Sequence, residues 1–352
     1  MIKFIIADTR GIYLEDKSFI AHYINVFNSL STIISKSFSN YEIVFAGVSK
    51  YKEIIDNTNF LCLPYSIEEK HDKNLFFRLK RGYVELKNNK FLFTNKEKGI
   101  FILQSSSFLI QLLSLAFSKK KYFLNKKILI IIYKNPFKDK SFIKRTLSKF
   151  LYFLTKNKIA YFLVSTELLK NEIGENSILL PDYFIERSNK SEIVKKEFDF
   201  GIFGYINPDK GCEEIIHFAK KYNYKLLIAG KFYQKEYFEH LKTVVNNSKN
   251  IKIINKFMSQ KEYEQYLNSC KFITFNYKID YNRSSGVFYE ALKYNIPIIA
   301  RKSYFFKVVD EFNLGVTFNE VSEIDRKLKN FNYSNVQNNI ENYIVNKNKH
   351  YI

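Results

Sequence analysis

The stretch 282–300 contains the residue types best suited to holding an anion and a sugar ring. It reads as a turn of small residues at 284–286, then a short helix and a buried strand. A Ser-Ser-Gly turn lets main-chain N–H groups and a helix N-terminus face an anion. Glu290 lies on that helix, and its two carboxylate oxygens suit the adjacent hydroxyls of a ribose. The stretch predicts a nucleotide site, and the alternative for Glu290 is an ordinary exposed carboxylate.

A second candidate for binding an anion follows the predicted strand 198–203. Gly204 lets a ligand approach the backbone, and Lys210 can reach back to a phosphate. The spacing matches neither G-x-G-x-x-G nor G-x-x-x-x-G-K-[ST], so neither a dinucleotide fingerprint nor an ATPase loop is present. An ordinary strand-to-helix turn with a surface lysine is the alternative.

The elements around these residues alternate between short apolar strands and helices. In the second half of the chain the predicted strands are 198–203, 226–229, 251–254, 272–275 and 298–300. Parallel sheets of this kind bind ligands at the carboxyl ends of their strands. Residues 284–286 and Lys210 are therefore expected at the same edge of one sheet.

The first half repeats this rhythm. Strands are predicted at 2–7, 41–46, 60–63, 100–103, 128–133, 160–164 and 178–180, and helices at 18–34 and 108–117. Short apolar strands between helices imply a parallel sheet covered on both faces. The charge-rich stretch 65–98 has no clear period and receives no element. Residues 187–197 form the best linker, which predicts an N-terminal domain at 1–190 and a C-terminal domain at 191–352, the last helix staying with the second domain or packing back on the first.

The positive charge of the chain is concentrated in one segment. The net charge is +21, and residues 118–158 contain thirteen Lys or Arg and one acid. Such a field favours phosphate-rich partners, although a compositional bias of the genome would give a basic chain too. Apolar and basic residues take opposite faces of a predicted helix in this segment, with Ile143, Leu147, Phe150, Leu151 and Leu154 on the apolar one. That face either packs on the sheet, leaving a solvated basic back, or the helix also lies on an anionic membrane surface.

The cysteines and the apolar runs bear on the compartment. Cys62, Cys212 and Cys270 are far apart and form no C-x-x-C pair, which fits a reducing cytosol. No run approaches 18 apolar residues, so neither a spanning helix nor a signal peptide is predicted. The expected location is cytoplasmic, peripheral on the inner face of the membrane.

Five segments, taken in order, resemble the nucleotide-sugar glycosyltransferases of the GT-B fold, in the large retaining group related to glycosyltransferase family 4. They are Gly204 to Gly211, Leu227 to Gly230, Ile253 to Met258, Tyr266 to Phe275 and Gly286 to Ala300. The resemblance implies an α/β fold with two Rossmann-like domains facing each other across a cleft. It places the donor in the second domain and the acceptor in the first. It implies neither a metal nor a cofactor, and the sequence has no D-x-D triplet.

The resemblance also implies roles for individual residues. Glu290 resembles the carboxylate that holds the donor ribose, and Lys210 the lysine that neutralises the diphosphate. Phe257 lies where the family's loop flanks the nucleobase. The phosphates are expected against the loop after the first strand and the turn before the helix, which contain Gly204, Tyr205, Ser284, Ser285, Gly286 and Val287.

The chain departs from the family pattern at two positions. Asn282 stands where a second Glu usually contacts the donor sugar, and Tyr205 stands where an Arg usually follows the loop glycine. Arg283 is our hypothesis for the replacement of that arginine. In the first domain, Gln104 and Ser105 occupy the place where a histidine or carboxylate is expected, and His22 reads as a helix residue rather than an acceptor contact.

The predicted function is a hexosyltransferase-like glycosyltransferase that moves a sugar from a nucleotide diphosphate donor to a surface glycan or its lipid-linked precursor. Lys210, Arg283 and the loop amides would stabilise the departing diphosphate, with Asn282 near the sugar. One rival is a non-catalytic, glycosyltransferase-like subunit that supports a partner enzyme. The other is a nucleic-acid binder, against which the basic segment shows no recognisable nucleic-acid module.

Overall fold

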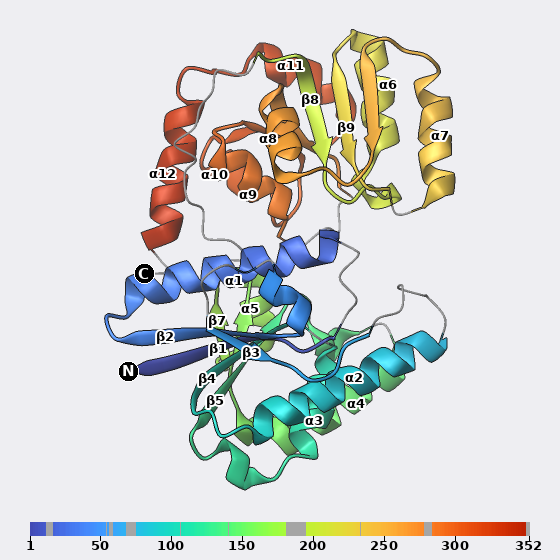
Figure 1. Cartoon of the computed structure of the whole chain (residues 1–352). Coiled ribbons are helices and arrows are strands. Elements are labelled where there is room, and N and C mark those ends of the chain that lie inside the picture. The colour runs from blue at the N-terminus through green and yellow to red at the C-terminus, as the bar shows by residue number, and fades with distance from the viewer. Residues whose placement is uncertain are drawn as a thin grey trace. The chain divides into compact units, whose positions relative to one another are not determined.

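The computed structural model describes residues 1–11, 17–53, 55, 59–67, 75–105, 107–139, 141–180, 195–232, 234–277 and 284–349. The chain divides into two compact units, Met1–Phe184 and Ile185–Tyr351 (Figure 1). Within the described part of the chain, no helix combines the length and the apolar character needed to cross a membrane.

The first unit is built on a seven-stranded parallel sheet with the order β3-β2-β1-β4-β5-β6-β7. The strands are β1 (Ile2–Asp8), β2 (Tyr41–Gly47), β3 (Asn59–Cys62), β4 (Gly99–Ser105), β5 (Lys126–Ile132), β6 (Ile159–Val164) and β7 (Ser177–Leu179). Each lies where the apolar runs predict a strand. The helices are α1 (Lys17–Ser37), α2 (Leu75–Thr94), α3 (Phe108–Ala116), α4 (Phe142–Thr155) and α5 (Glu167–Ile173).

Apolar side chains cover both faces of this sheet. Along β1, Ile5 packs in one core cluster and Ile6 in the other, because successive side chains point to opposite faces. Residues of α1 such as Phe27 join the cluster of Ile6, whereas Phe93 of α2 and Leu115 of α3 join the cluster of Ile5. The sheet is therefore buried on both sides, as its continuous apolar strands predict.

Helix α2 fills part of the stretch for which the sequence shows no clear period. Its buried side carries Glu85, Asn88 and Asn89 as well as apolar residues, so the apolar spacing of a helix is interrupted. Asn88 Nδ2 donates to the carbonyl oxygens of Thr9 at 3.1 Å and Tyr65 at 2.8 Å. This helix binds loops of the sheet through amide groups, which a search for apolar periodicity does not detect.

Helix α4 packs differently from the expectation that its broad apolar face covers the sheet. Its buried residues are Ser148, Leu151 and Thr155. Three residues expected to pack inward are instead exposed, namely Ile143 at 75%, Phe150 at 57% and Leu154 at 52%. The expectation is wrong because small side chains set the inward face of α4, so most of its apolar side chains face solvent.

Two lysines of the basic segment face inward rather than toward solvent. Lys126 Nζ donates to the carbonyl oxygens of Phe93 and Asn95, both at 2.6 Å, at the end of α2. Lys158 Nζ donates to that of Leu115 at 2.6 Å, at the end of α3. Basic side chains commonly satisfy the last carbonyls of a helix in this way. Burial lowers the pKa of Lys126 to about 8.

The second unit contains a six-stranded parallel sheet with the order β10-β9-β8-β11-β12-β13. Its strands are β8 (Phe198–Phe203), β9 (Leu226–Gly230), β10 (Ile251–Asn255), β11 (Cys270–Phe275), β12 (Ile298–Arg301) and β13 (Gly315–Phe318). Its helices are α6 (Cys212–Tyr222), α7 (Lys235–Val245), α8 (Gln260–Asn268), α9 (Gly286–Lys293), α10 (Lys307–Glu311), α11 (Ile324–Lys329) and α12 (Val336–Lys349).

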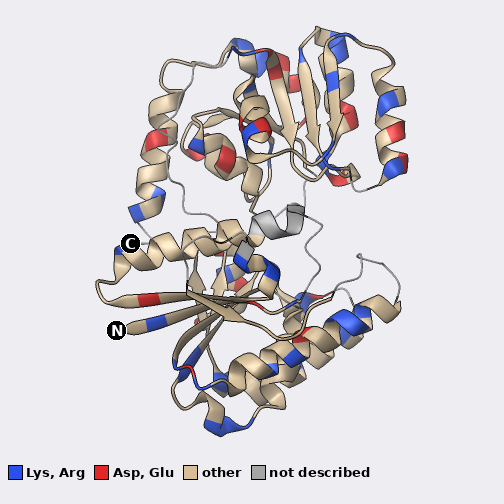
Figure 2. Cartoon of the chain, viewed as in Figure 1, with Lys and Arg blue, Asp and Glu red and all other residues tan. Residues whose placement is uncertain are grey.

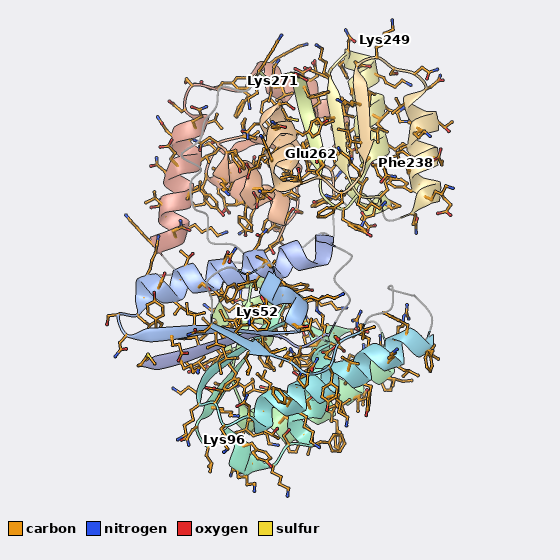
Figure 3. All side chains as sticks on the ribbon, in the orientation of Figure 1. Lys52, Lys96, Phe238, Lys249, Glu262 and Lys271 are labelled. Atoms are coloured by element: carbon orange, nitrogen blue, oxygen red, sulfur yellow. The ribbon has the colours of Figure 1, made fainter. Side chains whose placement is uncertain are left out.

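Local signals in the sequence explain several ends of these elements. Helix α8 begins with a capping box, in which Ser259 Oγ accepts from the Glu262 amide at 3.3 Å and Glu262 Oε2 accepts from the Ser259 amide at 3.0 Å. Glu262 is labelled in Figure 3. Helix α12 packs on the second unit, with the Tyr343 ring 5.0 Å from that of Phe312.

The strand order of the second sheet changes direction at β8. Strands β9 and β10 are added on one side of β8, and β11, β12 and β13 are added on the other side.

Candidate functional site

The predicted anion-binding residues of the second unit meet at the point where the strand order reverses. Lys210 lies in the connection that follows β8, and Tyr277 lies two residues after the end of β11. The carboxyl ends of two such neighbouring strands diverge and leave a crevice, which is where open parallel sheets bind ligands. The strand order therefore supports the predicted edge of the sheet.

The Lys210 ammonium is held over this edge by two oxygen atoms. Its Nζ donates to the Phe203 carbonyl oxygen at 2.6 Å and to the Tyr277 hydroxyl at 3.1 Å. The same ammonium lies 5.1 Å from the centre of the Tyr277 ring. These contacts fix a positive charge beside the end of β8, where an anion could replace the neutral hydroxyl as its partner.

Gly204 allows this lysine and the α9 helix to approach the backbone. Its φ is +91°, and a Cβ atom there would lie 3.1 Å from Val287 Cγ2 and 3.6 Å from Lys210 Nζ. A side chain at this position would occupy the space between the two segments. Three of the predicted residues, Gly204, Lys210 and Val287, are thus brought together.

Tyr277 connects Lys210 to the start of α9. Its hydroxyl lies 3.4 Å from Ser285 Oγ, and Ser285 is the N-cap residue of α9. The Ser285 side chain is buried and makes no capping hydrogen bond to the helix. The N-terminus of an α-helix has unsatisfied N–H groups and a partial positive charge, so it complements Lys210 in attracting an anion.

Glu290 lies further along α9, facing α8. Its Oε2 atom is buried and has no hydrogen-bond partner among the described residues. Burial raises the pKa of Glu290, Lys293 opposes this increase, and the nearby Glu264 of α8 adds to it. A buried carboxylate oxygen without a partner is costly, so a ligand that donates hydrogen bonds would stabilise it.

A network that the sequence reasoning missed holds the lysine loop in place. Asn276 Nδ2 donates to the Gly211 carbonyl oxygen at 2.8 Å, and Arg301 Nε donates to Asn276 Oδ1 at 2.8 Å. Arg301 also bonds Glu214 of α6 and the Asn319 carbonyl oxygen. Asn276, Tyr277 and Arg301 lie at or just after the ends of predicted strands, so the rule that places ligands at strand ends could have identified them.

The remaining predicted residues of the second unit are not all at this point. Phe257 follows β10 and is 46% exposed, and Tyr205 follows Gly204 and is 38% exposed. Ser284 immediately precedes the α9 cap. Asn282 and Arg283 lie outside the described residues, so their predicted roles stay predictions.

The first unit has a polar cluster at the carboxyl end of β1. Arg10 Nε and Nη2 donate to the two oxygens of Asp8 at 2.9 and 2.7 Å, and the Tyr51 hydroxyl also bonds Asp8. Burial raises the pKa of Asp8, but the Arg10 guanidinium outweighs this and holds the pKa below its usual range. The Arg10 guanidinium also lies 3.6 Å from the centre of the Tyr23 ring.

The predicted acceptor side of the chain is described in part. Gln104, in the neighbouring strand β4, is fully buried, and neither polar atom of its amide has a hydrogen-bond partner among the described residues. The side chains of Ser105 and His22 lie outside the description. Gln104 is thus an unsatisfied amide at the edge of the sheet where the resemblance predicts a histidine or carboxylate.

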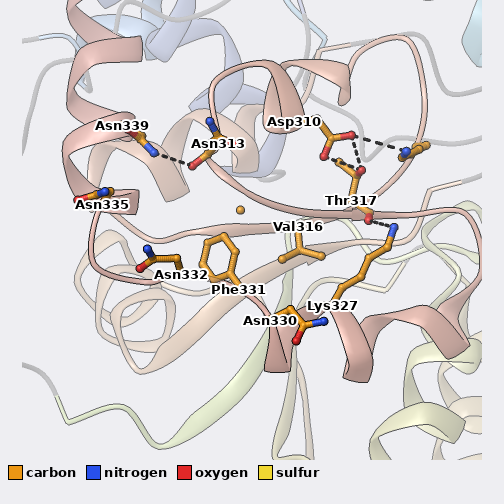
Figure 4. Close-up of a pocket in the computed structure, with 12 residues that line it drawn as sticks. Asp310, Asn313, Val316, Thr317, Lys327, Asn330, Phe331, Asn332, Asn335 and Asn339 are labelled. Atoms are coloured by element: carbon orange, nitrogen blue, oxygen red, sulfur yellow. Dashed lines mark hydrogen bonds and ion pairs between the residues drawn. The ribbon is translucent and has the colours of Figure 1, made fainter.

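A pocket of ≈ 500 Å³ lies elsewhere in the second unit, along the edge strand β13 (Figure 4). Its polar lining includes Asn313, Asn335 and Asn339, with Phe331 and Val316 between them. The Asp310 carboxylate accepts from Thr317 Oγ1, and Lys327 Nζ donates to the Thr317 carbonyl oxygen at 2.8 Å. No predicted site residue lines this pocket, so it is separate from the candidate site.

Residues 184–330 match the family model for glycosyl transferases group 1. No curated protein sequence matches the chain significantly. Among solved structures, AviGT4, a glycosyltransferase involved in avilamycin A biosynthesis, is similar with a TM-score of 0.63 and 10% identity, over 100% of this chain and 97% of that one.

Two further similar structures contain bound ligands. Alr3699/HepE from Anabaena, in complex with UDP and glucose, has a TM-score of 0.63 and 12% identity, over 99% of this chain and 98% of that one. A mutant of S. aureus TarM, in complex with fondaparinux, alpha-GlcNAc-glycerol and UDP, has a TM-score of 0.65 and 12% identity, over 100% and 97%. At such identities the likeness shows the fold. The predicted α/β fold class with two Rossmann-like domains of the GT-B kind is confirmed.

Proposed function

We propose that this protein, whose residues 184–330 match the group 1 glycosyl transferases, is a glycosyltransferase that moves a sugar from a nucleotide diphosphate sugar to a surface glycan or lipid-linked glycan precursor. One observation carries the proposal: α9 has a buried Glu290 oxygen that no described residue bonds, and an N-terminal Ser285 that contacts Tyr277 beside Lys210. A nucleoside diphosphate needs both a diol acceptor and a positive site for its phosphates.

The donor would bind to the second unit between Glu290 on α9 and Lys210 after β8. The ribose hydroxyls donate to Glu290, which gives its buried oxygen a partner. The diphosphate meets Lys210 and the amides at Ser285, Gly286 and Val287, and Gly204 leaves room for it. Phe257 flanks the nucleobase, while Arg283 supplies a second cation for the phosphates and Asn282 an amide for the sugar.

In the transfer step the bond between the anomeric carbon and the diphosphate oxygen breaks, the acceptor hydroxyl oxygen forms a bond to the same carbon, and the hydroxyl proton passes to the departing diphosphate. Negative charge grows on the leaving diphosphate. The Lys210 ammonium, which the Phe203 carbonyl oxygen and the Tyr277 hydroxyl position beside the end of β8, is available to stabilise that charge. We further propose that the enzyme retains the anomeric configuration and needs no metal ion.

The acceptor would bind to the first unit, at the carboxyl end of β1 and β4. Gln104 is suited to a sugar acceptor because an amide both donates and accepts hydrogen bonds, and here both functions lack partners among the described residues. The Asp8–Arg10 pair would keep this edge rigid. The basic segment 118–158 would hold the enzyme at the cytoplasmic face of a membrane that contains the acceptor lipid.

Transfer and hydrolysis assays with a panel of nucleotide sugars test the proposal. UDP-glucose is the first donor to try, since solved complexes of similar proteins contain UDP, glucose or UDP-glucose. Lys210→Ala should lower kcat by ~100-fold or more, because it removes a cation that stabilises the leaving group. Lys221→Ala, at the exposed far end of α6, is the matched control.

The same assay separates the enzyme from a non-catalytic subunit. A subunit that only supports a partner would neither hydrolyse nor transfer any donor of the panel, and Lys210→Ala would change nothing. Donor turnover that Lys210→Ala removes and Lys221→Ala leaves unchanged would exclude that alternative.

A further inference from the structure

The outer side of the first unit carries apolar side chains that no part of the described structure covers. On α4, the exposed residues include Phe142 at 69%, Ile143 at 75%, Phe150 at 57% and Phe153 at 68%. They lie opposite the buried side of this helix, which carries Ser148 and Leu151. A soluble domain rarely leaves so many large apolar side chains together in water.

Helix α2 presents a second row of the same kind. Leu75 is 72% exposed, Phe76 76%, Leu79 64% and Tyr83 59%. Leu79 follows Leu75 by four residues and Phe76 by three, and Tyr83 follows Leu79 by four, so all four lie on one side of the helix. Helix α3 contacts both α2 and α4, and all three lie on the same face of the sheet. We call the two exposed rows the α2/α4 surface; the helices that carry them cover the same face of the sheet (Figure 1).

Positive charges lie directly beside the aromatic rings of this surface. The Arg145 guanidinium is 5.5 Å from the Phe142 ring, and the Lys156 ammonium is 5.2 Å from the Phe153 ring. On α2, Lys87 is likewise 5.3 Å from the ring of Tyr83. Figure 2 shows further Lys and Arg residues along α2. Apolar side chains flanked by cations match the boundary between acyl chains and anionic headgroups.

We propose that the α2/α4 surface inserts its apolar side chains into the headgroup boundary of an anionic lipid bilayer. This inference rests on the membrane association proposed above. It adds a mode of binding: besides the attraction of the basic segment 118–158 to anionic lipid, the exposed faces of two helices insert between the lipids. The aliphatic side chains Ile143, Leu75 and Leu79 favour lipid over nucleic acid, because they cannot stack on bases as aromatic rings do. The surrounding positive charge disfavours a second copy of this surface as the partner.

Vesicle binding of the full-length protein tests the proposal without the transfer reaction. Vesicles of phosphatidylcholine, with and without phosphatidylglycerol, are titrated at low and high salt. Wild-type protein should bind the vesicles that contain phosphatidylglycerol, and part of that binding should persist at high salt because insertion is apolar. Phe150→Ser with Phe153→Ser should weaken binding at least ~10-fold at both salt concentrations. Arg145→Gln with Lys149→Gln should weaken it ~10-fold or more at low salt only.

A fluorescent variant measures insertion itself. The chain has no tryptophan, so Phe150→Trp introduces a single reporter. Its emission should shift to the blue on vesicles and be quenched by lipids brominated in the acyl chain. Tyr304→Ser, which removes an exposed aromatic ring from the second unit, is the control and should bind like wild type.

Several results would overturn the proposal. They are wild-type protein that binds neither vesicle, a double phenylalanine variant that binds vesicles like wild type, or a tryptophan that lipid bromine does not quench. A wild-type dimer that the phenylalanine substitutions convert to a monomer, without effect on vesicle binding, would assign the surface to self-association. Salt-sensitive RNA binding that replaces vesicle binding would also refute it. If Lys210→Ala abolishes transfer and keeps vesicle binding, the two proposals are separated.

Discussion

Glu290→Gln keeps the shape of a buried side chain and removes its charge, so it tests the two consequences of placing a carboxylate in this site. Glu290 Oε2 is buried and has no hydrogen-bond partner in the part of the chain that the structure describes, and burial raises the pKa of the group. A charge in that position destabilises the fold. Glutamine should therefore stabilise the ligand-free protein by ~1 kcal/mol. For a domain of this size the expected increase in Tm is about 2–4 °C.

Donor binding should change in the opposite direction. Each hydrogen bond from a ribose hydroxyl to the ionised carboxylate is worth ~1.5–3 kcal/mol. Glutamine keeps one acceptor oxygen but loses the charge and the second acceptor, so we expect a loss of ~3 kcal/mol, or about 100-fold in Kd. The substitution should thus raise the stability of the protein without donor and lower its affinity for the donor. Replacing a glutamate with a purely structural role would instead lower the stability.

Thermal unfolding with and without UDP measures both effects. At a UDP concentration of 100 times Kd, the wild-type protein gains about 2.7 kcal/mol. With Kd raised about 100-fold, the variant gains only about 0.4 kcal/mol at the same concentration. Glu236→Gln makes the same change of charge at an exposed position on α7 and should leave both values unchanged.

The pH dependence of UDP binding gives an independent check. The pKa of Glu290 is raised, so its protonation stabilises the ligand-free fold as pH falls, while it removes an acceptor from the ribose. UDP affinity should therefore decline as pH falls toward values still above the ordinary glutamate pKa, and Glu290→Gln should remove this decline. A variant with the wild-type UDP shift, or with a lower ligand-free Tm, would refute the reasoning.

Two further substitutions test the residues that connect the site. Tyr277→Phe removes the hydroxyl that contacts Lys210 at 3.1 Å and Ser285 at 3.4 Å, so calorimetry should show UDP binding weakened ~10-fold with little change in Tm; unchanged affinity would contradict this. Arg301→Lys removes the guanidinium donors to Asn276 Oδ1 and the Asn319 carbonyl oxygen, both at 2.8 Å. Urea unfolding should show a loss of stability of ~2–3 kcal/mol. Arg326→Lys, at an exposed position, is the control and should leave the stability unchanged. Equal stability of the two arginine variants would argue against a structural role of the Arg301 network.

The order of strands and helices follows well from the sequence where apolar residues alone set the pattern. Strands β8 and β11 of the second sheet lie where the apolar runs predict strands, because most of their residues are buried. Helix α2 escaped prediction because amides and a carboxylate share its buried side. The orientation of α4 was predicted wrongly, since the small residues Ser148 and Thr155 turn inward and an apolar count gives them no weight.

For the candidate site, the sequence predicts Gly204 and Lys210 after the end of a strand, because a glycine and a lysine in such a loop suit an anion by their local chemistry. It also predicts Glu290 on the helix after the Ser-Ser-Gly turn, whereas the role of this carboxylate follows only from the family resemblance. The sequence reasoning did not identify Tyr277 or the Arg301 network. Their contacts join residues far apart in the chain, such as Lys210 and Tyr277, which are 67 positions apart. The periodicity of apolar residues within a helix or strand does not predict a contact between residues so far apart in the sequence.

The sequence by itself determined two alternating series of strands and helices, the glycine and lysine after β8, and the turn and carboxylate of α9. These depend on side-chain period and on backbone preferences, which act over a few residues. Only the tertiary structure decided that Tyr277 links Lys210 to the start of α9, that no described residue bonds the buried Glu290 oxygen, and that α4 turns its phenylalanine rings outward. Those features arise from which elements the sheet brings together, because packing and burial depend on the whole unit.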